Sequence, residues 1–452
     1  MQLISPVDAS FLYLESRATP QHVSVLQTFA LPADAPEDFL RRLVQHFRDP
    51  RQLVAPWNLR LASPLLGRWL PAWRIDGDVD LEYHVRFCAL PRPGGERALG
   101  EQVSLLHAQP LDPSRPMWEC TLIEGLEGDR FALVMKMHHA LIDGVSAARL
   151  MGRVFSTNPA ARDLPPPWAT APPAREPRAD SAPAPARKSP RGLRSLLRLG
   201  RTLAGMSLES ARPGAELKAP FSCPDSPLNA RITAARRVAT QQYDLARLKA
   251  LARATDCTLN DLILYLAGSA LRRFLDEAGA LPSRALTAGL PVSLRLADDQ
   301  GTGNAISFMF ATLGSDIADP RQRLAAIRAS TSRAKTHLQA LPRELQTPYV
   351  LLLMAPSTLQ QGLGFGGRTP PNHNITISNV PGPAQALYLN GARMESMYPL
   401  GMPAHGLALN ITCLSYAGTF NIGLISCRDA LPHMQRIAVY MGEALDELEK
   451  LA

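Results

Sequence analysis

The segment MKMHHALIDGVSAARLM, residues 135–151, places two histidines, an aspartate and a glycine between two apolar stretches. Before it, residues 130–137 (RFALVMKM) are rich in apolar and aromatic side chains and predict a largely buried strand. After it, residues 145–155 (VSAARLMGRVF) have apolar residues at helical spacing. The polar residues therefore lie at a junction between a strand and a helix.

This junction suits proton transfer, because histidine has a pKa near neutrality and can take and return a proton. Adjacent residues at a strand end point to opposite sides, so only one of His138 and His139 can face a given cleft. We expect Gly144 to supply an unusual φ or a close backbone approach. Asp143 could cap the helix or neutralise a buried arginine. A single histidine here is more simply a core residue, but four such residues at one junction favour a functional site.

The bulk composition limits the class of protein. With 452 residues, 46% of them hydrophobic, the chain can form two good-sized cores. The six cysteines are scattered without a C-x-x-C pair, which argues against a zinc site or a disulfide framework and suits a reducing cytosol. No secretory signal opens the chain, and no run of apolar residues approaches the 18 that a membrane span needs. We therefore expect a cytoplasmic protein that is neither secreted nor transmembrane.

The net charge of +8 predicts an anionic partner, such as a nucleic acid, an anionic lipid or a phosphorylated ligand. The sequence contains no zinc-finger or RNP-type aromatic motif, so nucleic acid is the weakest of the three.

A composition shift divides the chain. Residues 159–190 hold ten prolines in 32 positions, mixed with alanine and arginine, and cannot form a packed core. We therefore predict an N-terminal domain over residues 1–157, a linker over residues 158–219 and a C-terminal domain over residues 220–452.

Within the linker, residues 191–209 (RGLRSLLRLGRTLAGMSLE) predict a basic amphipathic helix. One stripe holds the arginines and the opposite side holds the leucines, namely Arg191, Arg194, Arg198 and Arg201 against Leu193, Leu196, Leu197 and Leu203. Such a helix can lie in a membrane interface, with its arginines on anionic headgroups. It can equally pack on the surface of its own protein, and the sequence alone leaves both interpretations open.

In the C-terminal half, predicted strands and helices alternate. Residues 255–274 predict a helix. The Thr258 side chain can cap its start, and the Asp261 side chain can bond back to the Thr258 backbone or face the positive end of the helix. Strands are expected at residues 291–295, 304–310 and 374–383, the last ended by Pro-Gly-Pro, followed by a hairpin over residues 407–426 around Ala417-Gly418. Both halves are therefore expected to be α/β (α+β), each a mixed β-sheet with helices.

Residues 138–144 (HHALIDG) match the HHxxxDG signature of CoA-dependent acyltransferases and peptide-synthetase condensation domains. Further motifs make the chain similar to the bacterial wax ester synthase/diacylglycerol acyltransferase family. They follow the family's order along the chain: Pro6-Val7-Asp8 with Phe11-Leu12, His22-Val23, Leu111-Asp112 with Arg115-Pro116-Met117-Trp118-Glu119, Asn260-Asp261, Pro291-Val292-Ser293-Leu294-Arg295, Gly303-Asn304 and Ser378-Asn379-Val380-Pro381-Gly382-Pro383. Met117, where the family usually has Leu, and Gln21, where it usually has Met, depart from the pattern and put substrate preference in doubt.

The resemblance implies two chloramphenicol acetyltransferase-like domains with an active-site tunnel between them. It also implies acyl transfer from a long-chain acyl-CoA, acting as co-substrate, to a fatty alcohol or a diacylglycerol. The products would be wax esters or triacylglycerols. No bound cofactor and no metal are expected. The partners would be acyl-CoA, the acceptor lipid and an anionic membrane or lipid-droplet surface, with the protein peripherally associated with the inner membrane or lipid droplets.

The chemistry of the residues agrees with this resemblance. An alcohol that attacks a thioester needs a base within hydrogen-bond reach, and His139 is the predicted base. No cysteine has an obvious activating partner, so no acyl-enzyme is expected. We expect His138 to hold the loop, and Asp143 to form an ion pair for which Arg295 is the named candidate.

The remaining candidate residues have open roles. The oxyanion would need donors, for which Asn304, Ser378 and Asn379 are candidates. Pro116 and Trp118 could line the tunnel or belong to the core. Asn260 and Asp261 are expected to support the helix start.

Three other functions remain as alternatives. A condensation-type transferase would use carrier-bound acyl groups, but the chain contains no carrier domain. A non-catalytic lipid-droplet protein would not need HHxxxDG. A metal hydrolase using His138, His139 and Asp143 is disfavoured, because adjacent strand residues point apart.

Overall fold

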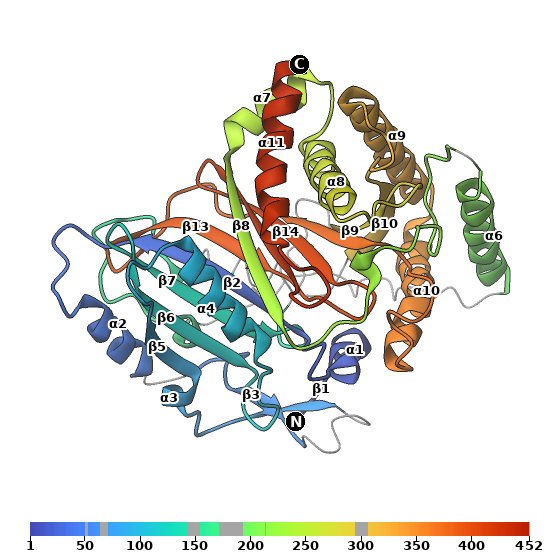
Figure 1. Ribbon diagram of the computed structural model, residues 1–452. Helices are drawn as coiled ribbons and strands as arrows, with labels where there is room; N and C mark the ends of the chain where they lie inside the picture. Colours follow the sequence, from blue (N-terminus) through green and yellow to red (C-terminus); the bar gives the residue numbers. More distant parts are fainter. Residues whose placement is uncertain are drawn as a thin grey trace, which may run out of the picture.

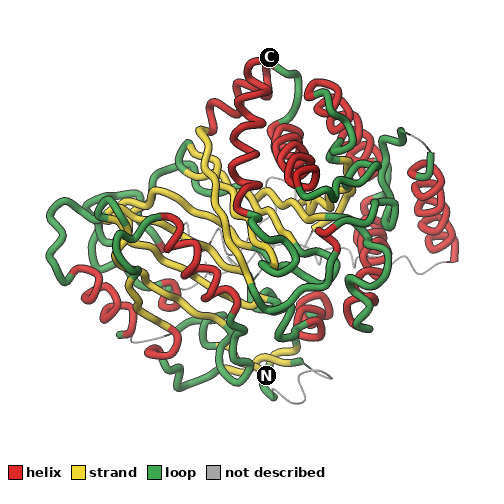
Figure 2. Tube along the Cα trace, viewed as in Figure 1, coloured by secondary structure: helices red, strands yellow, loops and turns green. Residues whose placement is uncertain are grey.

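The computed structural model describes residues 1–49, 53–63, 71–142, 150, 154–170, 193–212, 214–293 and 306–451. Two six-stranded sheets form the centre of the molecule, and helices surround them (Figures 1 and 2). This arrangement confirms the predicted α/β class with two sheet-containing halves. The tunnel that the resemblance implies stays a prediction.

The N-terminal sheet has the strand order β12-β13-β2-β7-β6-β5. The strands run over Tyr388–Leu389 (β12), Ala392–Leu400 (β13), His22–Ala30 (β2), Arg130–His138 (β7), Trp118–Leu126 (β6) and Val85–Ala89 (β5). All pairs are antiparallel except β5 with β6. A separate small sheet has the order β1-β4-β3, with strands Gln2–Leu3, Ala72–Ile75 and Leu59–Leu61.

The C-terminal sheet has the order β10-β9-β11-β14-β15-β8. Its strands run over Ile306–Thr312 (β10), Thr287–Ser293 (β9), Ile375–Val380 (β11), Leu409–Tyr416 (β14), Thr419–Cys427 (β15) and Arg236–Asp244 (β8). The predicted hairpin is confirmed as β14 and β15, which turn at Ala417 and Gly418 with positive φ values of 43° and 85°. Strand β11 is parallel to both of its neighbours, so this sheet is mixed, as predicted.

The helices of the N-terminal half are α1 (Pro6–Leu14), α2 (Phe39–Arg48), α3 (Leu81–His84) and α4 (Glu96–Ala108). Those of the C-terminal half are α7 (Leu245–Ala254), α8 (Leu259–Glu277), α9 (Pro320–Gln339), α10 (Arg343–Gly362) and α11 (Gln435–Leu451). Between them lies α6 (Leu193–Ser210), and short 3₁₀ turns occur at Pro167–Ala169 and Pro227–Asn229. Within the described ranges, no helix combines the length and the apolar character that crossing a bilayer requires.

One segment of the C-terminal half completes the N-terminal sheet. Strand β13 pairs with β2 along nearly its whole length, and β12 extends the same edge. Strand β13 also contacts β14 and β15 of the other sheet (Figure 1). Strands β12 and β13 therefore belong to the N-terminal sheet although they follow residue 220 in the chain.

Strand β7 is buried on both faces, as its run of apolar residues predicts. The odd-numbered side chains from Phe131 to Met137 pack with α2, and Ala132 and Val134 on the opposite face pack with α4. Since faces alternate along a strand, Lys136 and His138 continue the α4 face. The strand thus delivers a charged amine and an imidazole to one face, two residues apart.

The predicted start of α8 is confirmed. The Thr258 hydroxyl accepts the Asp261 N–H at 3.2 Å, and the Asp261 carboxylate accepts the Thr258 N–H at 2.9 Å, which completes a capping box. The second oxygen of Asp261 accepts a hydrogen bond from the Thr331 hydroxyl of α9 at 2.6 Å. The buried Asp261 thus links two helices as well as starting one.

The described part of α6 packs against the protein itself. Leu199 and Met206 are buried, and the Tyr349 hydroxyl of α10 contacts the Met206 sulfur at 3.3 Å. Glu209 near the helix end forms an ion pair with Arg333 of α9 at 2.8 Å. The side chains of residues 193–198, and with them Arg194 and Arg198, lie outside the described residues. From Leu199 onward, packing on the protein's own surface accounts for the apolar side of this helix.

His373 is buried beside Phe308 and Phe310, and its Nε2 lies 2.9 Å from the Thr376 hydroxyl. Burial lowers the pKa of this imidazole from its usual 6.5 to about 4. The folded protein therefore keeps the ring neutral while the unfolded chain takes up a proton below pH 6.5, so stability must fall as the pH drops from 6.5 towards 4.

We expect the free energy of unfolding to decrease over that range by about 3 kcal/mol from this residue alone. Urea denaturation at several pH values measures it. His373→Asn should show a shallower slope, whereas His433→Asn, a change at an exposed histidine, should keep the wild-type slope. An unchanged slope in His373→Asn would contradict the assignment.

Candidate active site

The two histidines of the HHxxxDG motif lie where β7 ends. The His138 N–H donates to the carbonyl of Met117 at the start of β6, and the His139 N–H donates to the carbonyl of Gln21 just before β2, both at 2.9 Å. The neighbouring strands therefore hold the backbone of the pair from both sides. Met117 and Gln21 are the two departures from the family pattern, yet they act here through carbonyl groups that any residue supplies.

His138 is only 2% exposed, and its ring supports the turn. Its Nδ1 accepts the N–H of Ala140 at 3.1 Å, so the ring proton of the neutral imidazole is assigned to Nε2. That nitrogen lies 3.3 Å from a carboxylate oxygen of Glu15, a contact that is not aligned as a hydrogen bond and becomes an ion pair only when the ring is protonated. Glu15 also accepts the Gln21 N–H at 2.5 Å. His138 thus belongs to a closed set of contacts around the strand end.

His139 is more exposed than His138 and lies against an aromatic ring. Its imidazole stacks on Phe11 with 4.3 Å between ring centroids and 27° between the planes. Stacking restricts the tilt of the ring, and its Nδ1 is buried. Of the two histidines, His139 is therefore the less buried.

Helix α1 supplies both partners of the histidines. Its N-cap is Ser5, whose hydroxyl accepts the Asp8 N–H at 3.1 Å, and a proline occupies its first turn. Phe11 and Glu15 are four residues apart, so they project from one side of the chain at the helix end. In the sequence, Phe11 belongs to a family motif, whereas Glu15 belongs to none of the motifs. The four-residue spacing of Phe11 and Glu15 was the feature of the sequence that could have indicated that both face the same side.

On the face of β7 that packs against α4, the charged side chain next to His138 has polar partners. Lys136 forms a buried ion pair with Glu119 at 2.8 Å and donates to the carbonyls of Leu106 and Gln109 at the end of α4. Burial lowers the pKa of Lys136, and Glu119 opposes that effect. His22 pairs across the strands with His138, and burial, followed by the Lys136 charge, lowers its pKa well below the usual value.

The tryptophan of the RPMWE segment lies in an aromatic cluster. Trp118 is fully buried, stacks on His84 and Trp168 at 4.4 Å and 4.8 Å, and meets Trp57 edge-on at 5.4 Å. Its indole N–H donates to the Trp57 carbonyl at 2.8 Å. Pro116, next to this cluster in the chain, is also buried. These contacts favour a packing role for Trp118 over a place on a tunnel wall.

The other sequence candidates fall into two groups. Asn260 and Asp261 lie at the start of α8, whereas Ser378 and Asn379 lie on β11, with Ser378 half-buried and Asn379 exposed. Asp143, Gly144, Arg295 and Asn304 lie outside the described residues. The proposed pair of Asp143 with Arg295, and an oxyanion role for Asn304, therefore stay predictions.

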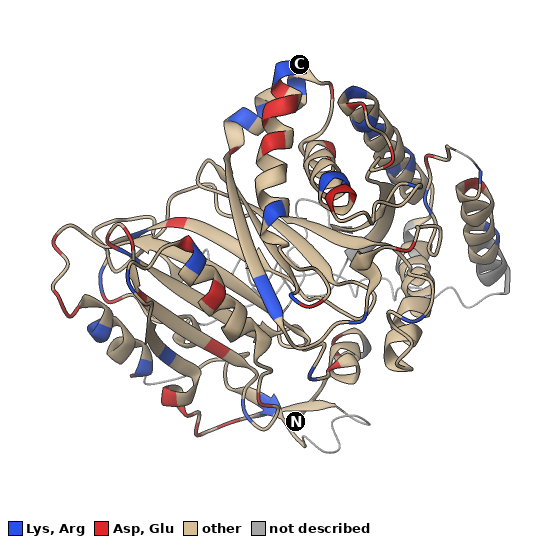
Figure 3. Ribbon diagram, viewed as in Figure 1, with Lys and Arg blue, Asp and Glu red and all other residues tan. Residues whose placement is uncertain are grey.

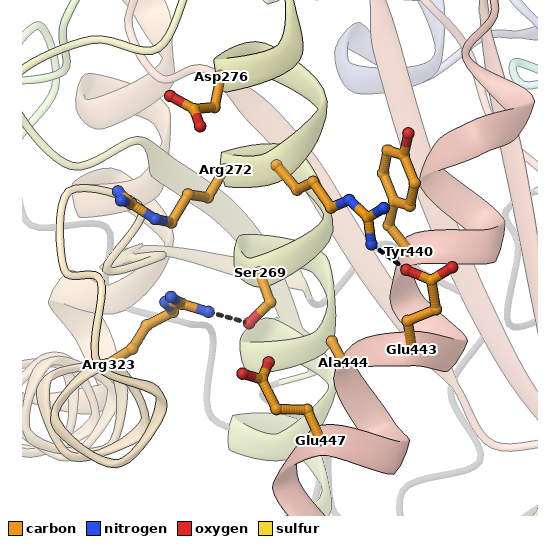
Figure 4. A pocket seen from close by; sticks show the side chains of 9 residues that line it. Ser269, Arg272, Asp276, Arg323, Tyr440, Glu443, Ala444 and Glu447 are labelled. Carbon is orange, nitrogen blue, oxygen red and sulfur yellow. Dashed lines mark hydrogen bonds and ion pairs between the residues drawn. The ribbon is translucent and has the colours of Figure 1, made fainter.

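A pocket of about 420 Å³ opens between α8, α9 and α11 (Figure 4). Two of its arginines hold the loop before α9: Arg323 donates to the carbonyls of Ile317 and Ala318 and to the Ser269 hydroxyl, and Arg272 donates to the carbonyl of Ser315. None of its lining residues belongs to the elements that hold the two histidines. This pocket is therefore separate from the candidate active site.

Comparison with known proteins places the chain in a family. A family model described as the wax ester synthase/diacylglycerol acyltransferase catalytic domain matches residues 4–263, and a WS/DGAT C-terminal domain model matches residues 302–449. A Mycobacterium tuberculosis H37Rv protein named as a diacylglycerol O-acyltransferase is 44% identical over 480 residues, covering 98% of this chain and 96% of the relative. A second from the same strain, named likewise, is 40% identical over 99% of both chains.

Solved structures agree with these matches. The wax ester synthase/diacylglycerol acyltransferase from Marinobacter aquaeolei VT8 superposes with a TM-score of 0.81 at 35% identity, covering 100% of this chain and 99% of that one. The first condensation domain of the calcium-dependent antibiotic synthetase superposes with a TM-score of 0.58 at 15% identity, covering 100% and 95%, which shows a shared fold alone. The chain therefore belongs to the wax ester synthase/diacylglycerol acyltransferase family.

Proposed function

We propose that this protein transfers a long-chain acyl group from acyl-CoA to the hydroxyl of a fatty alcohol or a diacylglycerol, with His139 as the general base. The observation that carries the proposal is the contrast between the two histidines. His138 is buried and committed to the turn, whereas His139 is half-buried and stacked on the Phe11 ring. This arrangement supports one imidazole for chemistry and one for scaffolding.

The proposed reaction proceeds without an acyl-enzyme. The imidazole of His139 takes the proton of the acceptor hydroxyl while the alcohol oxygen attacks the thioester carbon. The resulting oxyanion collapses, the carbon–sulfur bond breaks, and the imidazolium returns its proton to the leaving thiolate, which departs as free CoA. The balance requires only acyl-CoA and the alcohol, so no bound cofactor or metal takes part in the proposed step.

To test the proposed acyl transfer, purified protein is incubated with palmitoyl-CoA and either hexadecanol or a diacylglycerol in separate reactions. We expect ester formation, detected by mass spectrometry, with one equivalent of CoA thiol released per ester. Thiol release without ester would indicate a hydrolase instead. Transfer that occurs only from a carrier-bound acyl group would favour the condensation-type alternative. The His139→Ala protein is the control for spontaneous acyl transfer.

The place of action follows from the chemistry of the substrates. Long-chain acyl-CoA and long-chain alcohols partition into bilayers, so an enzyme that uses them gains from contact with a lipid surface. We therefore propose peripheral association with a membrane or a lipid droplet. The net charge of +8 on the chain supports attraction to anionic lipid.

A further inference from the structure

Helix α10 exposes a row of large apolar side chains. Leu345, Tyr349 and Leu353 lie on its buried side at four-residue spacing and pack into the C-terminal core. The other side and the turn that follows present five side chains that are 43–66% exposed, which we call the α10 ridge: Leu351, Leu352, Leu359, Leu363 and Phe365. Single exposed leucines are ordinary on a protein surface, but a concentration on one element indicates an interaction surface.

The charge around the α10 ridge suits a lipid rather than water. Residues 345–367 contain no charged residue, and no aspartate or glutamate occurs between residues 345 and 394. Figure 3 shows the contrast between α10 and the charged ribbons of α9 and α11. The cations near the end of the ridge are Arg368 and Arg231, both exposed, and Arg231 donates to the carbonyls of Gly364 and Gly366. An apolar face with a basic rim matches an anionic membrane interface.

Helix α10 lies next to the helix that carries the stacking partner of the candidate base. Helix α1 contacts α10 (Figure 1). It carries Phe11 against His139 and exposes Val7 and Tyr13, which are 44% and 45% exposed. A bilayer under this surface would therefore lie near α1, whose Phe11 stacks on His139.

We infer that the α10 ridge inserts into the acyl boundary of an anionic phospholipid bilayer, with Arg368 and Arg231 at the headgroups. The inference deepens the proposed function, on which it rests for the use of a lipid acceptor. It assigns the docking role to α10 rather than to α6, where Leu199 and Met206 are buried in the protein and Leu208 is the large apolar side chain exposed among those that the structure describes.

Matched substitutions on exposed helical positions test this surface. The ridge variant carries Leu351→Gln and Leu359→Gln, at positions 56% and 62% exposed. The control variant carries Leu105→Gln on α4 and Val439→Gln on α11, at positions 61% and 56% exposed. Glutamine is a good helix former, so both variants should fold, as circular dichroism verifies.

Binding is measured by flotation with vesicles of phosphatidylcholine and phosphatidylglycerol at 3:1. We expect the ridge variant to lower the partition coefficient by roughly tenfold or more and the control variant to change it less than about twofold. Arg368→Gln should weaken binding to these vesicles by about fivefold and leave binding to pure phosphatidylcholine unchanged. Vesicle binding that survives in the ridge variant, or that is lost only when Arg194, Arg198 and Arg201 of α6 become Glu, would overturn the inference.

Two further readouts separate this surface from its alternatives. The ridge variant should lose activity on vesicle-borne diacylglycerol while keeping activity on a detergent-dispersed short alcohol. Sedimentation that finds a wild-type dimer and a monomeric ridge variant would instead assign the ridge to a second copy of the chain. A wild-type protein that binds vesicles through the ridge but forms no ester would keep the inference and reject the proposed function.

Discussion

Replacing His139 by alanine should lower the rate of ester formation by about 10²–10⁴-fold and leave the protein folded, because general-base catalysis typically contributes that factor. The His139 ring contacts Phe11, but its N–H anchor to the Gln21 carbonyl belongs to the backbone and survives the substitution. The rate with palmitoyl-CoA and hexadecanol measures the loss, and thermal unfolding verifies the fold.

The matched control is His138→Ala. This change removes the Nδ1 acceptor of the Ala140 N–H and the partner of Glu15, so it should lower stability and reduce the rate less than His139→Ala does. A protein that keeps most of its activity without the His139 imidazole would exclude it as the base. A larger rate loss in His138→Ala than in His139→Ala, at equal folded fraction, would reverse the two roles.

Local sequence signals predicted the elements whose structure depends on nearby residues. The run of apolar residues at 130–137 became β7, the Thr258 and Asp261 pair became a capping box, and the Ala417-Gly418 turn joined a hairpin. Each of these depends on alternation, capping or turn geometry within a few residues. The same short range explains why the end of β7 could be predicted as a candidate site.

The contacts that complete the site are long-range and were not predicted. Phe11 and Glu15 reach the histidines only because α1 packs beside the end of β7, against Ala140 and Met117. Likewise, nothing within residues 392–400 indicates that this strand pairs with β2 near the other end of the chain. A single sequence reports which face of an element is apolar but does not report which other element covers that face.

Trp118 is another residue whose neighbours a single sequence does not report. Its substitution is expected to give the second large effect, a loss of stability. Its indole fills a space between His84, Trp57 and Trp168, and the ring leaves no exposed surface. Trp118→Ala should therefore lower the free energy of unfolding by about 3–5 kcal/mol, since truncation of a buried tryptophan leaves a cavity that the neighbouring rings cannot fill. Urea denaturation followed by circular dichroism measures the change.

Two comparisons decide whether Trp118 stabilises the fold or lines a substrate tunnel. Trp118→Phe keeps a ring in the stack and loses the hydrogen bond to the Trp57 carbonyl and part of the ring volume, so it should cost clearly less than the alanine change. Tyr13→Ala, at an exposed aromatic residue, should change stability by no more than about 0.5 kcal/mol. A tunnel residue would behave differently: Trp118→Ala would leave the unfolding curve in place and shift the KM for long-chain acceptors relative to short ones. With four aromatic rings in contact and no exposed edge, we expect the unfolding curve to move.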